Sequence, residues 1–177
     1  MLLYLVIYTV FGLIGGYLTA PLPGGAPIGM RFPFEPSITP PSWVFMLVWT
    51  SIYVGTAYVS YINDIHPQRS VDAKVNYSVV FFIHWLQQLA WPFIFFGLKQ
   101  YGPALAIIGS MICMLRSLDV PDTPQCKVVI RAYVAWLTFA FVLNAMVVYS
   151  SYGVAWSPSF TDQVCKGTVF GKWWCSR

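Results

Sequence analysis

Aromatic side chains at helical spacing form the first candidate for chemistry in this chain. Phe45, Trp49 and Tyr53 recur every four residues, so they share one face of a predicted helix. Three aromatic rings on one face near a helix start can form the wall of a pocket for a planar ligand. The alternative is that these rings pack against a neighbouring helix or meet lipid at the membrane interface.

A second stretch adds polar side chains. His84, Gln88 and Trp91 lie at spacings of four and three, which places them on one helical face. Polar side chains within a membrane span normally face the bundle interior or a cavity, so His84 and Gln88 are candidate anchors for a ligand. The alternative is that they only join helices through hydrogen bonds.

A third stretch combines an aromatic ring, a small side chain that leaves space beside it, and an amide. Trp136, Ala140, Leu143 and Asn144 fall at positions i, i+4, i+7 and i+8 of one helix. This arrangement suits a flat ligand and equally suits a tight helix contact. The sequence shows no acid–base pair, nucleophile triad or metal-binding spacing, so it indicates binding rather than hydrolytic or metal chemistry, and we predict no metal site.

The composition predicts an integral membrane protein. Of the 177 residues, 58% are hydrophobic and 9% are charged, and the mean hydropathy is +0.64. Ordinary soluble domains carry about 25% charged residues, so this chain has too few to cover a water-exposed surface. The net charge of +4 is small and dispersed, which argues against nucleic acid as a partner.

Five apolar runs predict a five-transmembrane-helix bundle in an all-α domain over residues 1–152. The expected spans are 2–20, 43–62, 77–98, 103–118 and 128–152. Pro92 lies inside the third span and should kink it or release a carbonyl. Gly12, Gly16 and Ala20 form a small-residue stripe on the first span, which favours close packing inside the bundle over the alternative of a dimer contact.

The segments between and after the spans are polar or rich in Pro and Gly. Residues 63–74 predict a loop, and the long 21–42 segment predicts either a lid over the bundle or a loose linker. The tail, 153–177, is expected to lie at the membrane interface. Whether Cys165 and Cys175 in this tail form a disulfide depends on the redox compartment and stays open.

Membrane orientation cannot be assigned from charge. Basic residues divide five against five between the two sides of a five-span topology. The odd number of spans still predicts that the two termini lie on opposite sides.

Three motifs resemble one known family. They are PSITPPSWVFMLVWTSIY at 36–53, AWPFIFFG at 90–97 and YVAWLTFAFVLN at 133–144. Their order and spacing, on five apolar spans, resemble the tryptophan-rich sensory protein and translocator protein family, also called peripheral benzodiazepine receptors. The resemblance covers roughly residues 15–144. The chain departs from the family pattern at Ile38, where a tryptophan is usual, at His84, where a glutamine is usual, and at Gln88, where an asparagine is usual.

The resemblance implies a membrane receptor, usually a homodimer, with a ligand pocket inside the bundle. Family members bind porphyrins and haem, isoquinolines and benzodiazepines and, in animals, cholesterol. Porphyrin or haem would therefore be a ligand rather than a required cofactor, and membrane lipid would surround the protein. Animal members lie in the mitochondrial outer membrane and bacterial members in a bacterial membrane.

The resemblance and the three faces together give a set of candidate ligand-binding residues. These are Ala20, Pro41, Trp43, Phe45, Trp49, Tyr53, His84, Gln88, Trp91, Pro92, Trp136, Ala140, Leu143 and Asn144.

Two alternative functions accompany the receptor interpretation. Some bacterial members are similar to light-dependent porphyrin-degrading enzymes, and their two implicated tryptophans match Trp49 and Trp136, which would then be catalytic. A transporter of tetrapyrroles or lipids is the other alternative. An internal repeat would support transport, and the sequence shows none.

Overall fold

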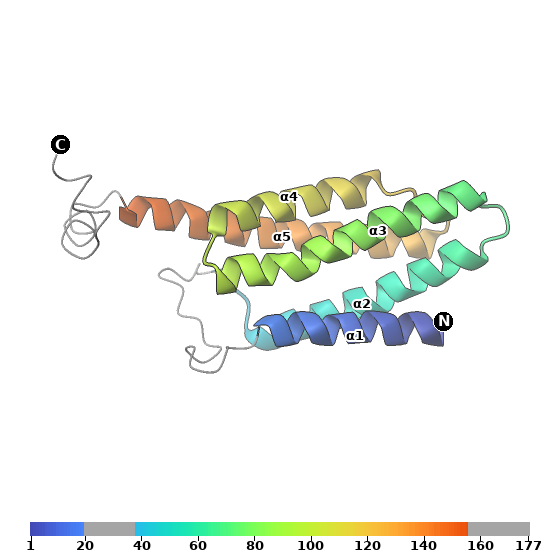
Figure 1. Cartoon of the computed structure of the whole chain (residues 1–177), viewed down its shortest axis with the longest axis horizontal. Coiled ribbons are helices and arrows are strands. Elements are labelled where there is room, and N and C mark those ends of the chain that lie inside the picture. Colours follow the sequence, from blue (N-terminus) through green and yellow to red (C-terminus); the bar gives the residue numbers. More distant parts are fainter. Residues whose placement is uncertain (20–37, 156–177) are drawn as a thin grey trace.

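The computed structural model describes residues 1–19 and 38–155, and all regular secondary structure in these ranges is helical. The helices are α1 (Leu2–Thr19), α2 (Ser42–Ile65), α3 (Val71–Pro92), the π-helical turn η1 (Phe93–Gly97), α4 (Tyr101–Ser117) and α5 (Pro124–Ala155). Figure 1 shows the five α-helices running side by side along the long axis of the molecule. The predicted five-helix bundle is confirmed. The candidate residue Ala20, residues 21–37 of the 21–42 segment and residues 156–177 of the tail, with its two cysteines, lie outside the described residues.

Three segments are long and apolar enough to cross a membrane. They are Trp43–Ile65, Val71–Gly97 and Pro124–Ser151. Two shorter apolar helices, Leu2–Gly12 and Tyr101–Ser117, pack beside them. Because α1 packs along α2 and α4 packs along α5, while α3 contacts α1, α2 and α4, all five helices form one bundle.

The predicted loop over 63–74 is wrong for most of its length. Helix α2 continues to Ile65 and α3 already begins at Val71. Ser70 caps α3, since its side chain accepts a hydrogen bond from the Ala73 amide at 3.2 Å, and Asp72 follows in the first turn, where the helix dipole favours an acid. Polar residues therefore extend these helices beyond the apolar core rather than end them.

Helix α5 also begins earlier than the predicted residue 128. It starts at Pro124, and the Thr123 hydroxyl accepts a hydrogen bond from the Cys126 amide at 3.3 Å. Proline suits the first helical position because its missing N–H would have no acceptor there.

Pro92 releases a helical carbonyl within the third span, as predicted, and the α-helix ends there. It has no N–H to bond the carbonyl of Gln88 four residues earlier. The following turn is π-helical, with the Leu98 amide bonded to the Phe93 carbonyl five residues before it at 3.0 Å. Backbone geometry thus changes within the membrane span itself.

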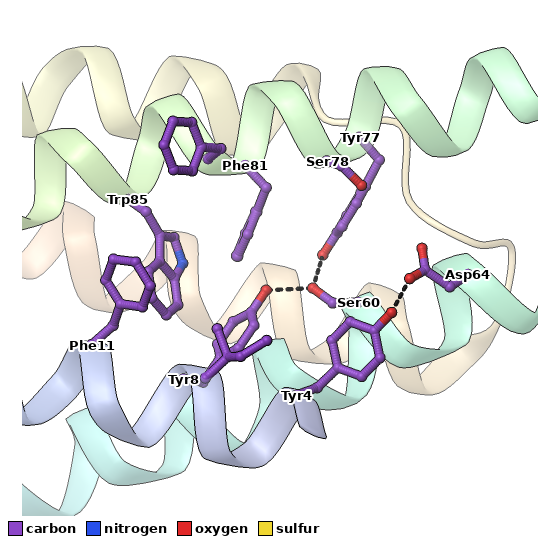
Figure 2. A pocket seen from close by; sticks show the side chains of 11 residues that line it. Tyr4, Tyr8, Phe11, Ser60, Asp64, Tyr77, Ser78, Phe81 and Trp85 are labelled. Atoms are coloured by element: carbon purple, nitrogen blue, oxygen red, sulfur yellow. Dashed lines mark hydrogen bonds between the residues drawn. The ribbon is translucent and has the colours of Figure 1, made fainter. Parts of the chain in front are cut away.

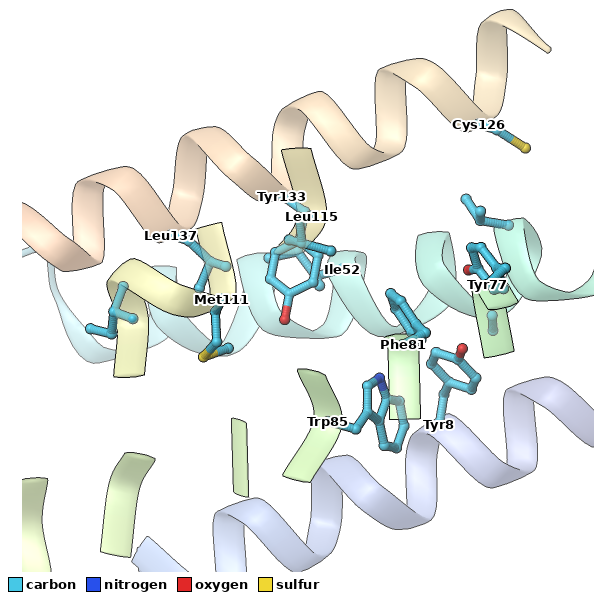
Figure 3. Packing of buried hydrophobic residues seen from close by; sticks show 13 residues of the cluster. Tyr8, Ile52, Tyr77, Phe81, Trp85, Met111, Leu115, Cys126, Tyr133 and Leu137 are labelled. Carbon is cyan, nitrogen blue, oxygen red and sulfur yellow. The ribbon is translucent and has the colours of Figure 1, made fainter. Parts of the chain in front are cut away.

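The core is rich in aromatic rings, which Figure 3 shows between the helices. Towards one end of the bundle, Tyr8, Tyr77, Phe81 and Trp85 pack together, and Tyr77 and Phe81 stack at 5.4 Å. Nearer the middle, side chains from α2, α4 and α5 meet, and they include Ile52, Met111, Leu115, Tyr133 and Leu137.

Side-chain bonds place three chain segments at one end of the bundle. The Tyr4 hydroxyl near the N-terminus bonds the Asp64 carboxylate in the last turn of α2. Arg69, between α2 and α3, pairs with Asp119, between α4 and α5, at 3.1 Å. The N-terminus and these two connections therefore share one end, whereas α5 ends at the opposite end (Figure 1).

This arrangement predicts that impermeant labels distinguish the two ends. In a background without the four native cysteines, Gln68→Cys in the α2–α3 connection and Gln100→Cys before α4 should react from opposite sides of sealed, oriented vesicles. Labelling of both positions from the same side would contradict the five-span topology.

Candidate functional site

Aromatic rings from α2 and α5 meet inside the bundle. Trp49 stacks on Tyr53 with centroids 5.9 Å apart, and its edge contacts Trp136 at 6.4 Å and Tyr133 at 6.2 Å. Phe45 contacts Trp136 at 5.4 Å. We call these five residues the ring cluster. The structure thus brings together four of the predicted wall residues, in the stacked and edge-on contacts that aromatic rings favour.

Because Gly12 of α1 has no side chain, it leaves room for the Tyr53 ring of α2. A methyl group at Gly12 would lie 2.7 Å from the Cε2 atom of Tyr53, which is closer than carbon atoms approach. The small-residue stripe therefore packs inside the bundle at Gly12, as predicted. This close approach holds the Tyr53 ring of α2 against the backbone of α1.

One amide joins three helices beside the ring cluster. The Nε2 atom of Gln88 donates to the Tyr53 hydroxyl at 3.0 Å, and the Tyr133 hydroxyl donates to Oε1 of Gln88 at 2.9 Å. Gln88 on α3 is thus bonded to both α2 and α5. This is the helix-joining alternative, observed in the structure, and it also orients two phenols of the ring cluster.

His84 extends this network. Its Nε2 atom lies 2.9 Å from the Tyr133 hydroxyl, whose single proton is already donated to Gln88, so the imidazole must be the donor. Its Nδ1 atom is then a buried acceptor with no partner among the described residues. The side chain is fully buried and its ring stacks on Phe81 at 5.7 Å.

Asn144 belongs to a second polar contact nearer the other end of the bundle. The neighbouring donors and acceptors set the orientation of the Asn144 amide. The amide oxygen accepts from Nε1 of Trp91 at 3.3 Å, and the amide nitrogen donates to the Tyr101 carbonyl at 3.2 Å. Trp91 also stacks on Phe95 at 5.0 Å. Trp136 and Asn144 therefore contact different neighbours, although they share one face of α5.

The remaining predicted residues occupy varied positions. Pro92 is buried, whereas Ala140 and Leu143 are half-buried on α5. Pro41 and Trp43 are exposed at the start of α2, with 61% of Trp43 accessible, and neither side chain forms part of the ring cluster.

Tyr133 is the central residue that the candidate set omits. It is 1% exposed and contacts Trp49, Gln88 and His84. Its spacing of three residues from Trp136 places both on one face of α5, and that spacing was the available signal. Its importance depends on hydroxyl partners from another helix, which a single sequence does not display.

Two hydrogen-bond donors in the ring cluster have no acceptor within the described ranges. The indole N–H of Trp136 is buried without a partner. The Tyr53 oxygen accepts from Gln88, but its own proton is not donated to any described residue. Two spare donors among aromatic rings can bind the acceptor oxygens of a flat ligand. No three His, Cys, Asp or Glu side chains in the described part of the chain are placed to hold a metal ion.

Fold and site together define a helical membrane protein with an aromatic, hydrogen-bonding interior. The model of the TspO/MBR family matches residues 4–150, and the chain belongs to this family. The chain is 28% identical to the translocator protein of Bos taurus over 147 residues, which cover 77% of this chain and 83% of the relative. It is 29% identical to the translocator protein of Homo sapiens over 126 residues, 67% of this chain and 72% of the relative.

A bacterial relative shows the same similarity. The tryptophan-rich protein TspO of Chlorobaculum tepidum is 27% identical over 115 residues, which cover 62% of this chain and 71% of that protein. The chain is therefore a membrane protein of the translocator-protein type, in contact with lipid.

Proposed function

We propose that this protein is a membrane receptor that binds porphyrin, haem and similar flat hydrophobic molecules at the ring cluster. The observation that carries the proposal is a pair of donors, Trp136 Nε1–H and the Tyr53 hydroxyl, which have no acceptor among the described residues and lie beside the Trp49 indole. A porphyrin offers a large apolar ring for the aromatic side chains and carboxylate oxygens for the two donors. The bound molecule is a ligand, and the function requires no cofactor.

Ligand entry must rearrange the two indoles. Trp49 and Trp136 meet at an interplanar angle of 88° with centroids 6.4 Å apart, so no flat ring fits between them without turning one indole. Binding should therefore change tryptophan fluorescence beyond simple quenching. In a eukaryote the receptor would lie in the mitochondrial outer membrane, and in a bacterium it would lie in a bacterial membrane. In both cases it would be a homodimer.

Titration of the purified protein in detergent tests this proposal. Protoporphyrin, haem and cholesterol are each followed by tryptophan quenching and by competition, with the porphyrin dimethyl ester as the control for the carboxylates. We expect the free acid to bind about tenfold more tightly than the ester, because the two spare donors can bond its carboxylates. A tenfold change in affinity corresponds to about 1.4 kcal/mol of binding free energy. Equal affinity for acid and ester, or no saturable binding, would overturn the proposal.

Light-dependent porphyrin oxidation is the second candidate function. The specific observation in its favour is that the indoles of Trp49 and Trp136 touch each other and Trp49 touches Tyr133. An indole that donates an electron to the light-excited porphyrin can then be resupplied from a ring in contact with it, and dissolved dioxygen is the oxidant of the net reaction. The enzyme would share the binding site of the receptor.

His84 is not expected to be an obligatory axial ligand of haem iron. Its Nε2 atom already bonds Tyr133, and its ring is fully buried against Phe81. A His84→Ala variant should keep the haem absorption spectrum, although the lost hydrogen bond should lower its thermal stability. A folded variant that bound metal-free porphyrin yet lost the haem spectrum would show that His84 does ligate iron.

A further inference from the structure

A hollow separate from the ring cluster lies between α1, α2 and α3 (Figure 2). Its volume is about 180 Å³. Sites for drug-sized ligands measure about 300–1,000 Å³, whereas an apolar cavity of about 150 Å³ holds a benzene molecule. The hollow is therefore too small for a porphyrin and has the right size for one ring with a short substituent.

Aromatic rings form the inner wall of this hollow. Trp85 of α3 is held between two residues of α1, with Tyr8 at 4.4 Å and Phe11 at 4.2 Å, both edge-on. Phe81 stacks beside Tyr8 at 6.0 Å. Because these rings fix one another, the wall is shaped before a ligand arrives, and aromatic faces attract both rings and cations.

Polar groups line the end nearest the α2–α3 connection. Ser60 bonds the hydroxyls of Tyr8 and Tyr77, the latter at 3.1 Å. Three hydroxyls hold three protons and their two mutual bonds use two, so at least one proton remains for another acceptor. One turn further along α2, the Asp64 carboxylate accepts from the Tyr4 hydroxyl and from Asn63 at 3.1 Å.

Within the described ranges, the Asp64 carboxylate has no cationic side chain paired with it. The nearby Lys74 ammonium instead bonds the main-chain carbonyl of Asp64 at 2.6 Å. Helix α2 ends one residue later and has no basic residue in its last turn. The negative end of the helix dipole therefore adds to the charge of Asp64.

The order of polar and apolar groups matches an amphiphilic amine at a membrane surface. Asp64 lies at the helix end, where water is near, and the rings of Phe11 and Trp85 lie deeper along the bundle. The rim residues Ile7 and Phe82 are 39% and 58% exposed, which leaves the hollow open on the outer side of α1 and α3. An amine in a bilayer keeps its ammonium at the interface and its ring in the hydrocarbon.

We propose that this hollow is a second ligand site, which binds the ring and the protonated amino group of a small amphiphilic amine. The ammonium donates to the Asp64 carboxylate, and the ring packs against Trp85 and Phe11. This site is independent of the ring cluster and does not depend on porphyrin binding there.

Ligand-observed NMR tests this site on the full chain in detergent micelles. The probe is 2-(4-fluorophenyl)ethylammonium, compared with the corresponding neutral alcohol, 2-(4-fluorophenyl)ethanol, and binding is read from the fluorine line width. Asp64→Asn should weaken binding of the amine at least tenfold and leave the alcohol unchanged. Asp72→Asn is the matched control, because Asp72 is exposed at the start of α3 and does not line the hollow. It should leave both affinities unchanged.

A filling variant tests the location without removing charge. The Ser78 hydroxyl bonds the Lys74 carbonyl of its own helix at 3.0 Å, so Ser78→Leu blocks the hollow without leaving a buried partner unpaired. It should abolish saturable binding of both probes. Equal affinity of the native chain for amine and alcohol, equal losses in the two Asn variants, or unchanged binding to Ser78→Leu would each overturn the proposal. The comparison of probes on the native chain decides the question even if Asp64→Asn does not fold.

Discussion

A Gln88→Leu variant is expected to lose stability and porphyrin affinity together. The substitution removes both bonds of the amide, which joins Tyr53 of α2 and Tyr133 of α5 to α3. An interhelical hydrogen bond in a membrane contributes about 0.6 kcal/mol on average, and the unpaired Tyr133 proton adds a cost, so unfolding should become easier by about 1–2 kcal/mol. Affinity for protoporphyrin should fall about tenfold, because Tyr53 and Tyr133, whose rings both contact Trp49, lose the hydrogen bonds that orient them.

The neighbouring residue supplies the matched control. Gln87 donates to the Ser110 hydroxyl of α4 at 2.8 Å, and no hydrogen bond among the described residues joins it to the ring cluster. Gln87→Leu should therefore make unfolding easier by about 0.6 kcal/mol and leave porphyrin affinity unchanged. Unfolding in denaturing detergent and porphyrin titration on the same three proteins separate the two effects. If both leucine variants lose the same affinity, Gln88 only supports the bundle.

The apolar runs were sufficient to predict the five helices, but not where they end. Asn63 and Asp64 look like loop residues by polarity, yet they occupy the last turn of α2. Hydropathy follows the membrane core, whereas a helix continues into water while caps and side-chain bonds satisfy its ends. Ser70 was the visible signal that α3 starts before residue 77.

The ring cluster was predictable in its parts and not in its connections. Four-residue spacing places Phe45, Trp49 and Tyr53 on one face, and the structure keeps them near Trp136. Spacing within one helix cannot show that Tyr133 forms hydrogen bonds with Gln88 and His84, because the partners lie 45 and 49 residues apart in the sequence.

The second hollow was invisible in the sequence for the same reason. Its polar end depends on Tyr4 meeting Asp64 and on Tyr8 meeting Ser60, residues 60 and 52 positions apart. No periodicity on one helix displays such pairs.

Trp49→Phe and Trp136→Phe are expected to slow light-driven porphyrin loss far more than they weaken binding, if the photochemical function operates. Phenylalanine keeps an aromatic wall at each position but is a poorer electron donor than indole. Contact between aromatic rings contributes about 0.5–1.5 kcal/mol beyond burial, so loss of part of that contact should weaken binding by about tenfold at most. Trp136→Phe should have the larger effect on affinity, because it also removes the unpartnered N–H donor.

Trp43→Phe is the control for these variants, because Trp43 is 61% exposed and lies outside the ring cluster. It should change neither affinity nor decay. Affinity, melting temperature and illuminated porphyrin decay are measured on all four proteins, and decay is expressed per bound porphyrin. If that normalised decay is equal in all four, light chemistry merely follows occupancy and the indoles serve binding alone. If it falls only in Trp49→Phe and Trp136→Phe while melting temperatures hold, the two touching indoles act on the bound ring itself.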